Sequence, residues 1–232
     1  MKPLAIVTGV GPGTGTALVR RFVEGGYRVA MIARDIARLD ALAGELPDAF
    51  AVPCDVSDVP ALHAVLEGIK AKAGSPQVVV HNAVGGAFAS FMDVAPEKLQ
   101  ENFDINVMAL FHLARWAAPL MLEHGKGAII VTGNTSALRG RAKFAGFAPT
   151  KAAQRILAES IARDLGPKGI HVAYLVIDAV IDVPWTRQAF PEAEHDFFIQ
   201  PSAIADEVFH LAHQDRSAWS FLAEVRPFRE TW

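Results

Sequence analysis

Four glycines directly follow the first apolar segment of the chain, and they constrain the fold more than any other feature. Residues 4–8 form a short strand-like run, a helical run begins near residue 16, and between them lie Gly9, Gly11, Gly13 and Gly15. In a strand–turn–helix unit, glycines let a bound phosphate approach the backbone, and the start of the helix favours an anion. A glycine-rich hairpin is the alternative. The alternation of strands and helices further along the chain favours the phosphate-binding turn.

Strand-like and helix-like segments alternate along the whole chain. Short apolar runs predict strands at 28–33, 49–53, 77–81, 127–132, 170–177 and about 220–225. Helical spacing predicts helices at 35–46, about 57–74, 96–124 with one bend, 147–165 and about 201–213, whereas residues 178–200 are expected to be irregular. Strands joined in this way form a parallel sheet, so we predict an α/β fold: one doubly wound sheet of about seven strands with helices on both faces. We expect residues 1–232 to form a single domain.

The composition argues against several classes of function. Hydrophobic residues make up 51% of the 232 residues, which fits a sheet buried on both faces. The net charge of −3 implies no broad basic surface for nucleic acid. The single cysteine, Cys54, permits no internal disulfide, and no group of His, Cys and Asp has metal-ligand spacing, so we expect no metal. We recognise no signal peptide and no membrane-spanning run, and therefore expect a cytoplasmic protein that binds no membrane.

Several motifs together resemble the short-chain dehydrogenase/reductase (SDR) superfamily along almost the whole chain. They are Thr8-Gly9 and Gly13-Thr14-Gly15 in the glycine turn, Asp55-Val56 after the third strand, Asn82-Ala83 after the fourth, Asn106, and Lys151. Val84 stands where the family usually has glycine. The resemblance implies a Rossmann-type fold, a nicotinamide nucleotide as cofactor, and oxidoreductase activity on a carbonyl or alcohol substrate.

The residue after the second strand bears on which nucleotide is bound. An acidic residue there accepts hydrogen bonds from the ribose of NAD, whereas an arginine can pair with the 2′-phosphate of NADP. The chain has Arg34 and then Asp35, so we favour NADP over NAD; alternatively, Arg34 is solvated and Asp35 only caps the next helix. The residues expected to contact the cofactor are Gly9, Gly11, Gly13, Thr14, Gly15, Arg34, Asp55, Val56, Asn82, Ala83, Val84, Lys151 and Ile181.

The position of the family's catalytic tyrosine is Phe147 in this chain, one helical turn before Lys151. In the family the tyrosine gives or takes the proton, and the lysine lowers the pKa of the phenol and holds the nicotinamide ribose. A phenyl ring has no proton to give. The family serine corresponds to Asn134, or to Ser136 if the loop is shifted by one or two residues. Asn106 and Lys151 of the family tetrad remain, so the resemblance implies an atypical site with weak or unusual activity.

Another group would have to supply the proton. A water held by Lys151 and Asn106 is one candidate, and Asp178 is another if burial raises its pKa. Other side chains that could carry a proton are expected to have structural roles. They are the two tyrosines, Tyr27 and Tyr174, and the histidines His81 and His112.

Two other functions are open on the same scaffold. One is nucleotide binding without turnover, as a sensor or a partner subunit, and the other is a non-redox reaction such as an elimination. The segment at about 183–200 is expected to cover the substrate site, and a small or apolar substrate would meet walls formed by Phe144, Phe147, Trp185 and Phe190. The resemblance also implies a homodimer or homotetramer, built through the apolar helices 96–124 and 147–165.

Overall fold

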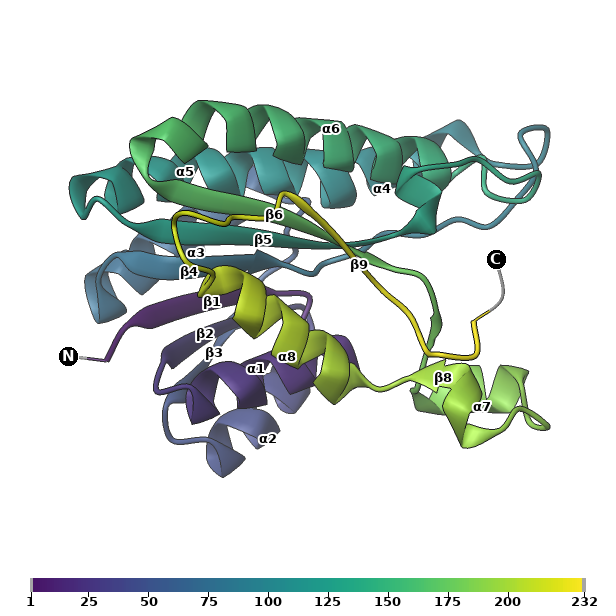
Figure 1. Ribbon diagram of the computed structural model, residues 1–232, viewed down its shortest axis with the longest axis horizontal. Coiled ribbons are helices and arrows are strands. Elements are labelled where there is room, and N and C mark those ends of the chain that lie inside the picture. Colours follow the sequence, from purple (N-terminus) through teal and green to yellow (C-terminus); the bar gives the residue numbers. More distant parts are fainter. Residues whose placement is uncertain (1, 231–232) are drawn as a thin grey trace.

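Seven parallel strands form one sheet in the order β3-β2-β1-β4-β5-β6-β9 in the computed structural model, which describes residues 2–230 (Figure 1). All five residues of β1 (Leu4–Thr8) are buried. The strand order reverses direction between β1 and β4, which is where open α/β sheets bind ligands. The other strands are β2 (Arg28–Ala33), β3 (Ala49–Pro53), β4 (Pro76–His81), β5 (Gly127–Asn134), β6 (Ile170–Ile177) and β9 (Leu222–Val225).

Helices cover both faces of this sheet (Figure 1). One core layer lies under α1 (Thr14–Glu24), α2 (Ile36–Glu45) and α8 (Pro201–Ala212). The opposite core layer lies under α3 (Val59–Ala73), α5 (Ala109–Glu123) and α6 (Ala148–Leu165), and α4 (Pro96–Phe103) continues into α5 on the same side of the sheet (Figure 1). The predicted doubly wound α/β fold is therefore confirmed.

A π-helical turn, Asp104–Met108, joins α4 to α5 within one continuous helix. By length and composition alone, this helix of 28 residues could cross a membrane, so the expectation that the chain has no such run is wrong. Its apolar window is 44% buried inside the protein, and residues such as Leu110 and Leu113 pack in the core. The apolar character of this helix is therefore partly explained by its contact with the sheet.

The expectation that residues 178–200 are irregular is wrong in part. β7 (Val180–Ile181) pairs in parallel with β8 (Phe198–Ile199), and α7 (Pro184–Ala189) lies between them. Arg187 donates two hydrogen bonds to the Asp182 carboxylate, at 2.6 and 2.8 Å, and this pairing lowers the pKa of Asp182 to about 2. The sequence does not reveal these two strands. Each has only two residues, too few to show the alternation of apolar and polar residues that marks a strand, and its partner lies at the other end of the segment.

Tyr27 and His112 have the structural roles predicted for them. The Tyr27 hydroxyl lies 2.9 Å from His213 Nε2 beyond the end of α8. His112 Nδ1 of α5 lies 3.2 Å from His63 Nε2 of α3, so this pair connects two helices on the same face of the sheet.

Candidate functional site

The glycine turn after β1 packs so closely that a side chain at either of two positions would collide with the backbone. Gly9 has φ +69°, and a Cβ on it would lie 2.5 Å from the backbone of Ala83. A Cβ on Gly15 would lie 2.4 Å from the Gly9 carbonyl oxygen. Gly11, in contrast, has no atom within 4 Å of the place where its Cβ would be. The turn is thus closed against the tip of β4 and open at Gly11, which fits a cradle for phosphate groups.

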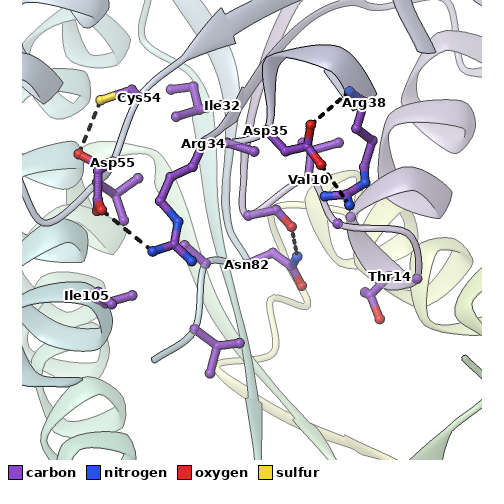
Figure 2. Close-up of a pocket in the computed structure, with 18 of the residues that line it drawn as sticks. Val10, Thr14, Ile32, Arg34, Asp35, Arg38, Cys54, Asp55, Asn82 and Ile105 are labelled. Atoms are coloured by element: carbon purple, nitrogen blue, oxygen red, sulfur yellow. Dashed lines mark hydrogen bonds and ion pairs between the residues drawn. The ribbon is translucent and has the colours of Figure 1, made fainter. Parts of the chain in front are cut away.

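A cleft of about 420 Å³ opens at the carboxyl ends of β1, β2, β3 and β4 (Figure 2). This volume is within the usual range for small-molecule sites. The cleft brings together twelve of the thirteen residues expected to contact the cofactor: Gly9, Gly11, Gly13, Thr14, Gly15, Arg34, Asp55, Val56, Asn82, Ala83, Val84 and Ile181. Lys151 is the thirteenth and does not line it.

Arg34 and Asp35 have different roles at the end of β2. The guanidinium of Arg34 is 74% exposed and lies 3.8 Å from the Asp55 carboxylate across the cleft (Figure 2). Asp35 caps α2, because its carboxylate accepts a hydrogen bond from the Arg38 N–H at 3.1 Å and pairs with the Arg38 guanidinium at 2.9 Å. Arg38 also lines the cleft, and it is not among the residues predicted to contact the cofactor. A second arginine one turn into the following helix is the signal that could have identified it.

Opposing effects act on the Asp55 carboxylate. Burial raises its pKa, but hydrogen bonds from the Ser57 hydroxyl and N–H and the charge of Arg34 outweigh burial, so the pKa lies below its ordinary value. Asp55 is therefore charged near neutral pH, and it balances the charge of Arg34 at the mouth of the cleft.

The amine of Lys151 lies in the protein interior. Lys151 is only 2% exposed, and its Nζ donates to the Thr132 carbonyl of β5 at 3.2 Å and to Gln154 Oε1 one turn further along α6. Burial lowers the pKa of this amine to about 7. The structure therefore places Lys151 beside the sheet, directed at β5 and Gln154.

Asn106 lies in the π-helical turn, and all of its side-chain polar groups are used. Oδ1 accepts from the Gly85 N–H at 3.0 Å, while Nδ2 donates to the Gly85 carbonyl at 3.0 Å and to Thr150 Oγ1 at 2.9 Å. The Asn106 carbonyl accepts a hydrogen bond from Gln154 Nε2 at 2.7 Å. The Gln154 amide therefore connects Asn106 to Lys151.

Gln154, next to Lys151, is a second residue that was not predicted from the sequence. It is fully buried, and its Oε1 also lies 3.3 Å from the hydroxyl of Tyr174, which is buried in β6 as predicted. Burial raises the pKa of Tyr174 far above its ordinary value. A polar side chain one turn after Lys151, in a helix that covers a sheet, is the signal that could have identified Gln154.

Phe147 is the residue immediately before α6, and its ring is 4% exposed. It lies 5.1 Å from the ring of Phe88 and 6.4 Å from that of Phe144, and these two rings are 5.2 Å apart. We refer to Phe88, Phe144 and Phe147 as the aromatic cluster. Phe88 is 65% exposed and forms its outer member. The ring of Phe147 is thus covered by other aromatic rings.

The two candidates for the family serine have local partners. Asn134 ends β5, and its Oδ1 accepts the Ser136 N–H at 3.1 Å, which caps the short turn that follows. Ser136 is buried. Neither residue lines the cleft, and Asp178 does not line it either.

His81 is fully buried at the end of β4, as expected for a structural group. Its Nδ1 lies 3.1 Å from Thr8 Oγ1, and its Nε2 has no hydrogen-bond partner among the described residues. Burial and the nearby charge of Lys151 lower the pKa of His81 to about 3, against the opposing effect of the Ile105 and Asn106 backbone. His81 is therefore neutral at physiological pH.

Comparisons with known proteins agree with this geometry. The family described as short chain dehydrogenase matches residues 3–192. The chain is 31% identical to an oxidoreductase of Sarocladium schorii over 201 residues (86% of this chain and 80% of the relative), and 30% identical to a 7alpha-hydroxysteroid dehydrogenase of Escherichia coli over 197 residues (82% and 76%). A metagenomic short-chain oxidoreductase crystallised with NADP superposes with a TM-score of 0.85 at 28% identity, over 97% of each chain. The chain belongs to the short-chain dehydrogenase family.

Proposed function

We propose that this protein is an NADP(H)-binding oxidoreductase of the SDR type that acts weakly on a small or apolar carbonyl or alcohol. The observation that carries the proposal is the cleft itself, because a backbone cradle at Gly9–Gly15 and a charged pair, Arg34 and Asp55, lie in one cavity. A dinucleotide needs both features: amide groups and close backbone approach for the pyrophosphate, and polar groups for the adenosine ribose.

The arginines of the cleft favour NADP over NAD. Arg34 is largely exposed, and its ion pair with Asp55 is long, so a 2′-phosphate can displace that pair at a cost of about 0.2–1 kcal/mol or less. Arginine and phosphate form strong, often bidentate hydrogen bonds. Asp35, the residue that would accept the ribose hydroxyl groups of NAD, is already bonded to Arg38. The structural relative crystallised with NADP supports a nicotinamide nucleotide as the cofactor.

The residues around Phe147 suggest slow turnover. A bound nicotinamide nucleotide would supply or accept a hydride. No proton donor stands at residue 147, and a general acid typically contributes about 10²–10⁴ in rate. Phe144 and Phe147 offer apolar contacts, and Trp185 and Phe190, which we place in the segment at 183–200 that covers the site, are partly exposed. A small or apolar substrate fits these walls.

Binding without turnover is the second candidate function, and the position of Lys151 favours it. The amine that the family uses to hold the nicotinamide ribose is engaged with Thr132 and Gln154 and does not line the cleft. A sensor or partner subunit would keep the cradle and would not need that amine.

Calorimetric titration with NADPH and with NADH tests the binding proposal. NADPH should bind about tenfold or more tightly than NADH, and Arg34→Ser should remove most of this difference, since a charged hydrogen bond contributes about 1.5–3 kcal/mol. Arg20→Ser is the matched control, because Arg20 is exposed on α1, pairs with Glu45 and lies outside the cleft. Absence of binding by either nucleotide at millimolar concentration would refute the proposal.

A panel of ketones and aldehydes assayed by NADPH oxidation then separates the two candidates. Oxidation above that of buffer supports the oxidoreductase, and tight binding with no oxidation on any member supports the sensor.

We also propose that the protein is a cytoplasmic homodimer or homotetramer that assembles through the helices at 96–123 and 148–165. Met108, Leu122 and Ile156 leave 40%, 37% and 51% of their surface exposed on these helices, and exposed apolar groups of this kind are often covered in an oligomer. Light scattering tests the assembly, and a monomer at micromolar concentration would refute it.

A further inference from the structure

A continuous series of hydrogen bonds connects the glycine turn to the π-helical turn through the interior. Asn82 Nδ2 donates to the Gly9 carbonyl at 2.9 Å, and Asn82 Oδ1 accepts from Thr132 Oγ1 at 3.0 Å. The Thr132 carbonyl accepts from Lys151, and Lys151 also donates to Gln154. The Gln154 amide then donates to the Asn106 carbonyl. Gln154 is therefore the only member of the series whose side chain both accepts from Lys151 and donates to Asn106.

The Gln154 amide is important for the charge of Lys151, because few other groups stabilise that charge. Among residues 2–230, no carboxylate forms an ion pair with Lys151, so its charge is stabilised only by the two oxygens that accept from it. The titratable groups that face it are His81 from β4 and Tyr174 from β6, with Arg155 of α6 acting on Tyr174. Neither His81 nor Tyr174 supplies a negative charge at neutral pH, because an imidazole is neutral or cationic and the raised pKa of Tyr174 keeps its phenol protonated.

We propose that Gln154 is a positioning residue that holds the Lys151 amine against β5, outside the nucleotide cleft, and stabilises its charged form. Lys151 is 2% exposed and Gln154 is fully buried, so neither side chain gains from contact with water. The amide accepts from Lys151 through Oε1 and is anchored by the Asn106 carbonyl through Nε2, which fixes the direction of the accepting oxygen. Two of the three N–H groups of the amine are thus directed at β5 and at Gln154.

Substitutions at residue 154 should change the charge balance of the amine in opposite directions. Gln154→Met preserves volume but removes the acceptor, which disfavours the ammonium form. Gln154→Glu keeps an oxygen near the amine and adds a negative charge, which favours the ammonium form. Gln154→Met discriminates between the two roles, because a residue that only filled space could be replaced by methionine without altering the titration of Lys151.

Because Lys151 is buried, its titration is measured without a chemical label, from the ¹³Cε chemical shift of ¹³C-labelled lysine in the nucleotide-free protein between about pH 6 and about pH 10, with the resonance assigned by its loss in Lys151→Met. The wild-type midpoint should lie near the Lys151 pKa of about 7. Gln154→Met should lower the midpoint, and Gln154→Glu should raise it by about one pH unit or more. Gln100→Met, a substitution of an exposed glutamine on α4, should match the wild type.

The inference is overturned if either variant, folded by circular dichroism, titrates with the wild-type midpoint. Gln154→Met is the discriminating change, and Gln154→Glu, which keeps the side-chain volume and an accepting oxygen, keeps the test possible if Gln154→Met does not fold. The inference rests on the proposed function for the role of Lys151 but does not need nucleotide to bind, because the titration is measured without it. A shifted midpoint without NADPH binding would support the role of Gln154 and contradict only the proposed function.

Discussion

His81 should make the protein progressively less stable as the pH falls, and the size of this effect follows from the site. The His81 pKa is about 3 in the folded chain and about 6.5 when unfolded, because burial and Lys151 disfavour the imidazolium. Between these values the unfolded chain binds a proton that the folded chain does not, so the free energy of unfolding decreases as the pH decreases. Between about pH 7 and about pH 5, His81 alone should remove about 2 kcal/mol.

Urea denaturation followed by circular dichroism at the two pH values measures the effect. His81→Asn keeps a polar atom near Thr8 Oγ1 and cannot titrate, so the wild type should lose about 2 kcal/mol more than this variant over the interval. The cost of the smaller side chain is common to both pH values and cancels. His210→Asn, which replaces an exposed histidine of α8, is the matched control. Equal losses in wild type and His81→Asn would refute the reasoning.

Three further predictions concern the cleft and its neighbours. Phe147→Tyr restores a phenol one turn before Lys151 and should raise NADPH-dependent carbonyl reduction by about 10², whereas Phe144→Tyr should not; an unchanged rate in a folded Phe147→Tyr variant would show that more than the acid is missing. Gly15→Ala should lower the melting temperature, because its Cβ would lie 2.4 Å from the Gly9 carbonyl oxygen, whereas Gly11→Ala should not. Equal melting temperatures of the two variants would contradict this. Cys54 is buried and its pKa is raised to about 11, so iodoacetamide at about pH 8 should modify it only after unfolding, as followed by mass spectrometry; modification of the native protein would disprove this.

The strands and the nucleotide cleft could be predicted because their signals are local. The ends of β1, β2 and β3 agree with the sequence analysis, since each is a short apolar run that stops at turn residues. The glycine turn depends on residues that are adjacent in the chain. Residues such as Asn82 and Asp55 then reach the cleft because parallel strands present their carboxyl ends at one edge of the sheet.

Side-chain partners could not be predicted, because they depend on how distant elements pack. The Gln154 side chain bonds both to the Lys151 amine and to the Asn106 carbonyl. The neighbours of Gln154 in the sequence do not indicate the bond to Asn106, which lies in another helix. Asp35 illustrates the same limit. Both a ribose ligand and a helix cap are consistent with its position, and the structure has the cap.

The π-helical turn at 104–108 has a consequence for the length of this helix. A π turn contains one more residue than an α turn, so removing one residue would give a regular α-helix and leave α4 and α5 in nearly the same rotational register. Asn102, whose amide donates to the Gly146 carbonyl at 2.6 Å, would keep its direction toward the loop before α6. The change would fall on the turn itself, where the Asn106 side chain bonds to both backbone groups of Gly85. A one-residue deletion here should therefore disturb the Asn106–Gly85 contacts and leave the packing of α4 in place.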